Sequence, residues 1–528
     1  MQSYLQYRRI HQAVKLHIDR TSKEDTAALS SSEGEGNGSI RSQPLYHDLP
    51  PANPTGVPSE EAEIRVAQWE DYDFHLNPRN YSPWRKSAMT ALVSLIGLSC
   101  TAASAIDSAG VSQYSEYFGV SRVVGSLTTG LFMIGFGIGS FVSGPFSETF
   151  GRNMIYMVTM VVFLIWIMAA GLAPNIQSHL VFRFLAGLFA ATPLTCVGGT
   201  VADLWDPLQK TYGFIIYTIP AFNGPMIGQV IGSYIPMTLG WRWLEWIMLI
   251  FGGLMLTVMI FLQQETHQDL LLTWKAAALR KYSGQECWRG PMEIREITLW
   301  QRLKIAITRP FIWIMTEPII ILISLYLIVI YIILFLFLEG YRFIFEDIYH
   351  FSQGLNNVTW IAMFIGSAMV TLQVPFVWYV SRKQQEKISR IHPETRLWYA
   401  MLGGAPAIPI SLFWMAWTTY RHISVWSSII ASAVFGFGIT TVFISAHLYV
   451  IDAYEKGAAS AFAMLVMPRY LASGGITVAG APIYSSIGVH YTLSILGAIS
   501  AVMAFVPYVF YFYGHQIRRV SPHAVVHD

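Results

Sequence analysis

The sequence predicts an all-α polytopic membrane protein in which twelve transmembrane helices form two six-helix bundles. The first observation is composition: only 12% of the 528 residues are charged and 53% are hydrophobic, whereas about a quarter of the residues of a soluble globular chain are charged. The second is a series of apolar segments near the roughly 20 residues that a helix needs to cross a bilayer. A soluble fold, a disordered chain and a secreted disulfide scaffold are therefore excluded.

The polar interval 264–309 divides the apolar segments into two sets of six. The predicted spans are 88–109, 123–144, 154–173, 179–201, 212–235, 242–263, 311–338, 357–380, 397–418, 425–450, 458–480 and 489–513. This division predicts two repeats packed about a cavity near the membrane midplane. The expected parts are a tail at 1–86, bundles at 87–263 and 310–514, a central loop at 264–309, and a tail at 515–528.

The first 86 residues carry no apolar segment or cleavage site typical of a signal peptide. Residues 30–59 are rich in Ser, Gly, Glu and Pro, which favours disorder because such a stretch cannot bury a core. Residues 4–20 mix basic and apolar side chains, and we expect a short solvated helix there, with a membrane-surface helix as the alternative. The segment as a whole is predicted to be a disordered cytoplasmic tail.

Lysine and arginine set the expected orientation. Clusters of them occupy 264–309 and 381–396, and basic residues also flank the first and last spans. With an even number of spans, all of these lie on one face, which the positive-inside rule places in the cytoplasm. Both termini are then cytoplasmic, and the sequon at Asn357 faces outward, where it can carry a glycan.

Several other functions are excluded or disfavoured. The net charge of +2 argues against a nucleic-acid partner, and the three cysteines form no metal-binding or disulfide pattern. We therefore expect neither a metal nor a cofactor. No phosphate-binding loop occurs, so active transport would have to draw on an ion gradient. His447 and Asp452 have the spacing of an acyltransferase pair, but five helical steps point them to different faces.

The strongest local motif lies between the second and third predicted spans. It runs Gly144-Pro145-Phe146-Ser147-Glu148-Thr149-Phe150-Gly151-Arg152. Its glycines permit a tight turn, and Glu148 and Arg152 can pair with each other or with Asp203. This motif resembles the loop signature of the major facilitator superfamily.

Further segments resemble the fungal twelve-span drug:proton antiporters of that superfamily. Arg183 and Gly187 match a motif whose arginine the resemblance implicates in proton coupling. Gly224, Pro225 and Gly228 form the core of the antiporter motif, although Pro220 and Gln229 stand where that motif has glycine. The other matching segments are Gly240-Trp241-Arg242-Trp243, Gln264-Glu265-Thr266, Arg309-Pro310, Glu317-Pro318 and Pro393-Glu394-Thr395-Arg396.

The resemblance implies a monomeric proton-coupled exporter of small hydrophobic or amphipathic molecules, such as a secondary metabolite, toxin or drug. We expect it in the plasma membrane, with the vacuolar membrane as the alternative. An uptake permease of the same fold is the second candidate function, and a polytopic membrane enzyme is a third. Cytoplasmic latch residues are implied at Gly144, Glu148, Gly151, Arg152, Asp203 and Asp452.

Two pairs of charged residues are candidates for proton coupling. At roughly 1.5 Å per helical residue, Asp107 and Arg183 both lie close to the outer surface and can meet. An arginine without a partner in lipid costs at least a few kcal/mol. We expect a proton at Asp107 to release this pair, with a static structural pair as the alternative. Glu317 and Arg469 form the second candidate pair, and His447 is either a packing residue or a proton-accessible group.

The substrate cavity is predicted from aromatic and polar residues of the later spans. Flexible and aromatic linings suit apolar or aromatic small molecules, and the absence of an acidic cluster disfavours polycations. The candidate lining residues are Tyr217, Phe222, Tyr326, Tyr331, Gln373, Phe437 and His447.

Overall fold

The computed structural model describes residues 2–32, 64–294, 299–454 and 457–524. The chain divides into two compact units. The small unit comprises Met1–Tyr81 and Gln268–Ile297, and the large unit comprises Ser82–His267 and Thr298–Asp528. Each unit is described by itself.

The small unit joins the N-terminal segment to part of the central interval. Helix α1 (Gln2–Ser32) packs against α12 (Gln268–Ser283), and strand β1 (Arg65–Val66) pairs in parallel with β2 (Trp288–Arg289). Two short 3-10 helices, η1 (Phe74–Leu76) and η2 (Pro78–Asn80), complete it. Apolar side chains of α1 and α12 form its core, namely Ile10, Val14, Leu271, Ala276, Ala278 and Leu279.

A buried lysine also joins the two segments of the small unit. The ammonium of Lys275 lies 2.8 Å from a carboxylate oxygen of Asp73 and 3.2 Å from one of Glu70. The prediction of a disordered tail at 1–86 is therefore wrong for the described residues, although the helix expected at 4–20 is present as part of α1. The predicted central loop at 264–309 contains α12 and β2. Residues 33–59, the larger part of the low-complexity stretch, lie outside the described residues.

Within the described residues, the large unit contains twelve helical spans long and apolar enough to cross a membrane, as predicted. Six form the N-bundle, whose elements are α2 (Pro83–Ile106), η3 (Asp107–Gly110), α3 (Val111–Phe118), α4 (Arg122–Phe150), α5 (Arg152–Gly171), α6 (Ile176–Ala190), α7 (Thr192–Leu204), α8 (Lys210–Phe222), α9 (Gly224–Ile231), α10 (Ile235–Thr238) and α11 (Arg242–Leu262).

The other six spans form the C-bundle, which α13 (Leu299–Thr316) precedes. Its elements are α14 (Pro318–Tyr341), η4 (Arg342–Ile348), α15 (Gln353–Val358), α16 (Trp360–Ala368), η5 (Met369–Gln373), α17 (Val374–Ile388), η6 (Pro393–Leu397), η7 (Ala400–Gly404), α18 (Ala405–Thr418), α19 (Val425–Ala453), α20 (Ala458–Ile487), α21 (Val489–Met503) and α22 (Val506–Val520).

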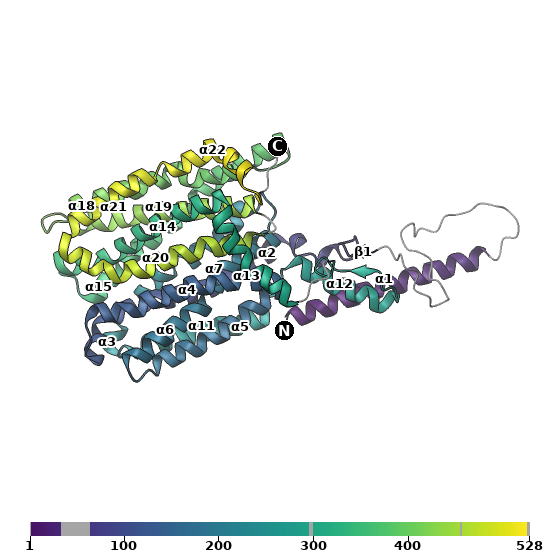
Figure 1. The fold of residues 1–528 in the computed structure, drawn as a ribbon, viewed down its shortest axis with the longest axis horizontal. Coiled ribbons are helices and arrows are strands. Elements are labelled where there is room, and N and C mark those ends of the chain that lie inside the picture. The colour runs from purple at the N-terminus through teal and green to yellow at the C-terminus, as the bar shows by residue number, and fades with distance from the viewer. Residues whose placement is uncertain (1, 33–63, 295–298, 455–456, 525–528) are drawn as a thin grey trace. The chain divides into compact units, whose positions relative to one another are not determined.

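The first and last spans begin and end on the same face of the large unit, because the number of crossings is even. We call this face, where Pro83 and Val520 lie, the terminal face, and the other the distal face. Figure 1 shows α3 and α15 together at the distal end of the bundles. Helix α4 of the N-bundle runs along α20 of the C-bundle over much of the length of both.

Local sequence signals set the ends of several spans. Ser121 caps α4 by accepting a hydrogen bond from the Val124 amide, and Asn175 caps α6 in the same way from Ser178, as short polar side chains do. Gly151 separates α4 from α5 at a φ of 92°, a conformation that favours glycine. The predicted loop at Gly144 is instead helical, because α4 continues to Phe150.

The seventh span begins later than predicted. Helix α13 ends at Thr316, Glu317 is extended with a ψ of 100°, and α14 begins at Pro318. A proline disfavours helical geometry for the residue before it, so the chain breaks at Glu317. The span runs over Pro318–Ile348 rather than 311–338. Every estimate of a residue's depth in the membrane that is measured from the start of this span therefore changes.

Candidate functional site

A cluster of four buried ionisable side chains lies in the N-bundle near the distal face. The Arg183 Nε lies 2.9 Å from Asp107 Oδ2, and an Arg183 terminal nitrogen lies 3.5 Å from Glu245 Oε1. His179 Nε2 lies 3.5 Å from the same Asp107 oxygen. None of the four is more than 2% exposed. The predicted contact of Asp107 with Arg183 is therefore present, within a larger group that we call the distal cluster.

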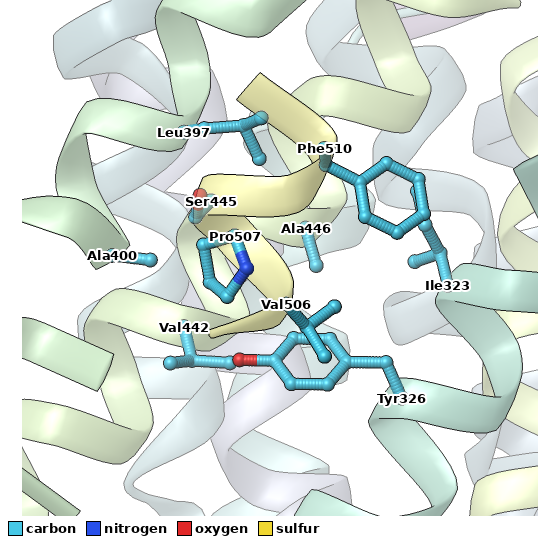
Figure 2. A pocket seen from close by; sticks show the side chains of 10 residues that line it. All are labelled: Ile323, Tyr326, Leu397, Ala400, Val442, Ser445, Ala446, Val506, Pro507 and Phe510. Atoms are coloured by element: carbon cyan, nitrogen blue, oxygen red, sulfur yellow. The ribbon is translucent and has the colours of Figure 1, made fainter. Parts of the chain in front are cut away.

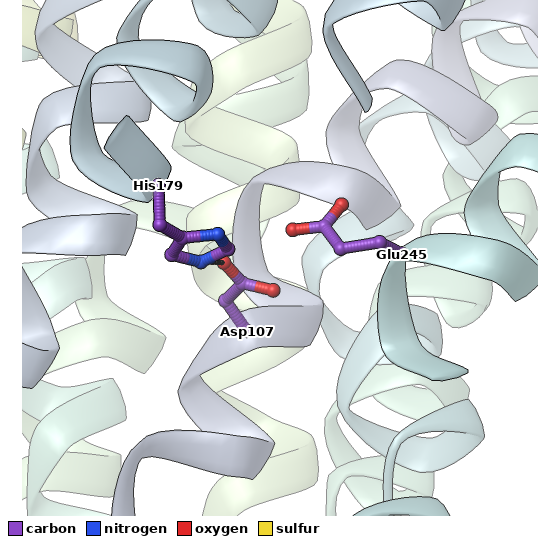
Figure 3. A group of neighbouring side chains, drawn as sticks. All are labelled: Asp107, His179 and Glu245. Atoms are coloured by element: carbon purple, nitrogen blue, oxygen red, sulfur yellow. Dashed lines mark ion pairs between the residues drawn. The ribbon is translucent and has the colours of Figure 1, made fainter. Parts of the chain in front are cut away.

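Three helical elements bring the distal cluster together. Asp107 begins η3, a 3-10 turn that is wound more tightly than the α-helix before it. His179 and Arg183 are one turn apart on α6. Glu245 lies in the first turn of α11. Figure 3 shows the imidazole of His179 and the carboxylates of Asp107 and Glu245 converging from these three elements.

Hydrogen bonding places a proton within the distal cluster. His179 Nδ1 lies 3.1 Å from the Ala170 carbonyl oxygen, and a carbonyl only accepts, so Nδ1 carries hydrogen. The other ring nitrogen, Nε2, faces the Asp107 carboxylate, and a bare nitrogen would repel it. This contact is favourable only when a hydrogen lies between the two groups, so His179 and Asp107 are candidates, together with Glu245, for holding a proton in the distal cluster.

Charge balance also favours one proton in the distal cluster. With one proton on His179 or on either carboxyl group, the charges of the buried group sum to zero, whereas loss of that proton leaves a net negative charge. Uncompensated charge away from water is strongly unfavourable.

The three ligand-type side chains of the distal cluster lie close enough to one another to bind a metal ion. The Arg183 guanidinium, however, already contacts Asp107 and Glu245, and it supplies the positive charge that a metal would bring. The residues present therefore fit an arginine-centred ion-pair group better than a metal centre.

His179 and Glu245 were not among the predicted site residues. His179 precedes Arg183 by four positions, which places both on one face of a helix. Glu245 stands two residues after the Trp243 of the Trp-Arg-Trp motif. These spacings could have drawn attention to both residues. The rotation of α11 about its axis, which sets the direction of the Glu245 side chain, cannot be derived from the sequence.

The second predicted pair, Glu317 with Arg469, is wrong. Glu317 accepts hydrogen bonds from the Tyr454 hydroxyl at 2.8 Å and from the His523 backbone amide at 3.0 Å. It precedes α14 at the terminal face instead of lying inside a span. Arg469 lies deeper, in α20, and donates a hydrogen bond to His447 Nε2 at 2.7 Å.

His447 is a neutral packing residue in this structure. Its Nε2 accepts from Arg469, so its hydrogen is on Nδ1, which faces the Phe443 carbonyl oxygen at 2.7 Å. Both ring nitrogens are thus occupied. Of the two alternatives for His447, the contacts favour the packing residue over the proton-accessible group.

Contacts between the bundles close the terminal face. The Lys210 ammonium of the N-bundle lies 3.2 Å from Asp452 of the C-bundle, and Arg396 lies 2.6 Å from the other oxygen of the same carboxylate. Arg396 also donates to the Thr211 hydroxyl at 2.6 Å. Asp452 is therefore part of a contact that must break when this face opens, as a latch residue must.

The signature motif contributes a second contact between bundles. Glu148 accepts hydrogen bonds from the backbone amide and the hydroxyl of Ser460 in α20, at 3.3 and 3.2 Å. Arg152 instead lies 3.2 Å from Asp203. Because Arg152 and Asp203 belong to the same bundle, this pair does not support the latch role that the resemblance implies for Asp203.

Contacts between the bundles also close the distal face. Gln113 of α3 donates a hydrogen bond to Gln353 of α15 at 3.1 Å, and Gln353 donates to the Ala109 carbonyl oxygen at 2.5 Å. Nearer the middle of the spans, Asn223 donates to the Ser367 hydroxyl at 2.7 Å. The bundles are thus in contact at both faces.

Glycines allow close approach of the helices within and between the bundles. A Cβ at Gly130 would lie 2.9 Å from the Gly474 carbonyl oxygen, so α4 and α20 meet almost backbone to backbone. In the antiporter motif, a Cβ at Gly224 would overlap the Thr101 hydroxyl at 1.8 Å, and one at Gly228 would lie 2.5 Å from the Ala102 carbonyl. These two glycines therefore allow α9 to approach α2.

A central cavity of about 20 Å³ lies between the bundles. Three predicted residues line it, namely Tyr217, Phe222 and Tyr331. A distal cavity of about 40 Å³ shares Pro225 and Phe335 with it and is also lined by Ser108, Gln229 and Glu339. Ser108 follows Asp107 in the chain, so the distal cavity lies beside the distal cluster.

The remaining predicted lining residues lie elsewhere. Tyr326 lines a separate cavity of about 20 Å³ whose walls come from the C-bundle alone (Figure 2). Gln373 donates to the Leu402 carbonyl at 3.1 Å, beside the kink in η7. Phe437 and His447 line none of these three cavities. Aromatic content alone did not distinguish cavity walls from helix packing.

Glu339 is a cavity residue that sequence reasoning missed. It stands one position past the predicted end of the seventh span, which the structure extends to Ile348. Its stem packs on Gly480, and its carboxyl group has no hydrogen-bond or ion-pair partner among the described residues. In the sequence, Glu339 is a single acid at the end of a long apolar stretch, and this pattern does not indicate that its side chain faces a cavity.

The predicted glycan at Asn357 is not compatible with this structure. Asn357 lies in α15 with its side chain 6% exposed, and its amide nitrogen is fully buried. A glycan needs that nitrogen at the surface. Helix α15 turns the sequon inward, where it contributes to the packed distal face.

The fold and the distal cluster together define a multi-pass membrane transporter. A family profile described as "Major Facilitator Superfamily" matches residues 92–474, and the chain belongs to this family. It is 40% identical to "MFS-type transporter kojT" of Aspergillus flavus over 98% of this chain and 99% of that protein.

Two further comparisons concern a second relative and a solved structure. The chain is 30% identical to the "Ascochitine biosynthesis cluster MFS transporter" of Didymella fabae, over 89% of this chain and 92% of that one. The solved structure of the proton:xylose symporter XylE superposes with a TM-score of 0.59 at 13% identity, covering 82% of this chain and 97% of that chain. At this identity the structural likeness supports the fold alone.

Proposed function

We propose that this transporter exports small hydrophobic or amphipathic organic molecules in exchange for protons. The observation that carries the proposal is the distal cluster, in which Asp107, His179, Arg183 and Glu245 are buried together beside the distal cavity. A transporter with a buried proton site beside its cavity can couple movement of the proton to movement of the substrate. A secondary metabolite is the favoured cargo, since a 30% identical relative is named for a biosynthesis cluster.

The coupling follows from the contacts of Arg183. When Asp107 is ionised, it holds Arg183 at 2.9 Å and ties α6 to the first span. Breaking one side of a buried ion pair costs about 3–5 kcal/mol, so protonation of Asp107 weakens this tie considerably. We infer that protonated and deprotonated clusters favour opposite orientations of the bundles.

The proton reaches the distal cluster from the distal cavity. Gln229 donates a hydrogen bond to the Ser108 hydroxyl, and Ser108 adjoins Asp107 while both Ser108 and Gln229 line that cavity. Opening of the distal face would separate Gln113 from Gln353 and admit water to this point. We place the terminal face in the cytoplasm, on the basis of its lysines and arginines, and the protein in the plasma membrane.

Efflux from intact cells tests the proposal. Yeast cells that lack their own drug exporters would express the protein or Asp107→Asn and be loaded with a panel of hydrophobic compounds. We expect the wild type to lower the retained amount of at least one compound, and a protonophore or Asp107→Asn to abolish that effect. Accelerated uptake of panel compounds would support the permease function instead. Export insensitive to the protonophore would contradict proton coupling.

A further inference from the structure

Arg469 is a buried cation without a negatively charged partner. It lies in α20 with 1% of its surface exposed, and its Nε has no hydrogen-bond partner. No carboxylate among the residues that the structure describes lies within ion-pair distance of it. Its one polar side-chain contact within those residues is the neutral His447 at 2.7 Å. The charge is thus only partly compensated.

Aromatic rings surround the guanidinium. It lies 4.6 Å from the ring centroid of Tyr331, 5.2 Å from Phe443 and 5.5 Å from Tyr470. Cation–π contacts of this kind recover only part of the free energy that removing a charge from water costs. The rings therefore stabilise the arginine without neutralising it.

The same three rings line the central cavity between the bundles. Arg469 itself does not line this cavity; its guanidinium lies against three rings of the mostly apolar and aromatic wall. Tyr217 and Phe222 complete that wall from the N-bundle. An anion in the cavity would be attracted by the positive charge beyond these rings, and it would reach the guanidinium when one of the ring side chains moves aside.

We propose that Arg469 binds the anionic group of the substrate, so that the cargo is a small aromatic or amphipathic organic acid. This inference rests on the proposed function and specifies its substrate class. The substrate supplies the counter-charge that the described part of the protein lacks, and a guanidinium suits planar carboxylate and enolate groups because it donates two parallel hydrogen bonds. The aromatic wall accommodates the rest of the molecule.

A cationic substrate is the competing possibility, because Glu339 lines the adjoining distal cavity. The two possibilities differ in the charge of the substrate that would bind. The central cavity has a cation with no counter-charge among the described residues against three of its aromatic rings, whereas the distal cavity has one carboxyl group in its wall. A set of probes of equal size and different charge separates them.

The test measures ligand binding to the purified full-length protein in detergent. Benzoate, benzyl alcohol and benzylammonium would be titrated at pH 7.5, and the melting temperature followed. We expect benzoate to raise the melting temperature of the wild type, with little shift from the other two. In Arg469→Gln we expect the apparent Kd for benzoate to rise at least tenfold, and in Arg469→Lys to recover part of the loss.

Two controls separate binding from structural support. Ligand-free Arg469→Gln should melt no lower than the wild type, because it loses a poorly compensated buried charge; a structural role for Arg469 predicts a clear drop. Tyr326→Phe, in the separate C-bundle cavity, should leave the benzoate titration unchanged. Equal or stronger binding of benzylammonium, no benzoate shift in the wild type, or unchanged benzoate affinity in Arg469→Gln would overturn the proposal.

Failure of this inference is distinguishable from failure of the proposed function. The titration involves neither a membrane nor a proton gradient, so it reports on the anion site even if transport proves to be uncoupled. Proton-coupled export of neutral compounds only, with no benzoate binding, would contradict the anion site and leave the coupling intact.

Discussion

Lys210 and Asp452 belong to opposite bundles, and their charged groups lie 3.2 Å apart at the terminal face. Because Arg396 holds the second oxygen of the same carboxylate, Asp452 links both bundles through one group. This contact must break whenever the central cavity opens toward the terminal face.

Tethering these two positions should stop transport. The variant would carry Lys210→Cys and Asp452→Cys, with the natural Cys100, Cys196 and Cys287 replaced by serine. We expect a short thiol-specific bifunctional reagent with a cleavable disulfide to abolish efflux, because alternating access requires this face to part, and dithiothreitol to restore it. The single Lys210→Cys variant is the control. Full efflux by the tethered protein, with the cross-link verified by mass spectrometry, would contradict an opening at this face.

Close packing of α4 against α6 depends on Gly139. A Cβ there would lie 1.8 Å from the Leu188 carbonyl oxygen, whereas a Cβ at Gly253 in α11 would meet nothing within 4 Å. We expect Gly139→Ala to lower the melting temperature by several degrees. Gly253→Ala should leave it unchanged or raise it, since alanine favours a helix by about 0.5–1 kcal/mol over glycine. Equal effects of the two substitutions, measured in the same detergent, would argue against the α4–α6 contact.

His267 makes stability sensitive to acid at the end of the N-bundle. Burial, together with the nearby Arg152, lowers the pKa of His267 to about 3, while an unfolded histidine titrates near 6.5. The unfolded state therefore binds the proton more readily, so the stability is complete above about pH 6.5 and decreases as the pH falls toward 3.

Between pH 7 and pH 5 this effect amounts to about 2 kcal/mol. The melting temperature of the wild type should therefore fall over this interval, and His267→Gln should show a smaller fall because glutamine does not titrate. The comparison uses the difference between the two pH values within each variant, which removes any constant effect of the substitution. An identical fall in both proteins would show that His267 is not the group responsible.

Glu339 should be chemically reactive, unlike the paired acids. Dicyclohexylcarbodiimide is an apolar reagent that modifies protonated carboxyl groups in membranes. Glu339 faces the distal cavity without a described partner, whereas Asp107 is held by Arg183. We expect peptide mass spectrometry to find the adduct on Glu339 and little on Asp107, with labelling that declines as the pH is raised. Preferential labelling of Asp107 would reverse this assignment.

The sequence predicted the fold class and one central contact correctly for physical reasons. Spanning length and charge content identify membrane helices, because the bilayer imposes both. Asp107 and Arg183 could be paired because helical rise converts position in a span into depth, and the two reach the same depth from opposite ends. The depth of a residue along a helix does not tell, however, in which direction its side chain points around the helix axis, so Glu245 and His179 were missed.

Errors in the prediction trace to boundaries and to pairing over long distances in the chain. The break at Pro318 displaced Glu317 from the bilayer and invalidated its partnership with Arg469. The extension of the same span beyond residue 338 brought Glu339 into a cavity wall. The small unit could not be foreseen because α1 and α12 are each weakly apolar segments, about 250 residues apart in the printed sequence, and only their pairing buries a core.

The central claim is that binding of a proton at Asp107 in the distal cluster drives movement of the substrate. Proteoliposomes containing the wild type or Asp107→Asn would be assayed with a transported compound in two modes, exchange at equal pH and uphill accumulation under an imposed pH gradient. We predict that Asp107→Asn retains exchange, which needs no net proton movement, and loses accumulation. Undiminished accumulation in Asp107→Asn, with the same dependence on the pH gradient as the wild type, would contradict the account.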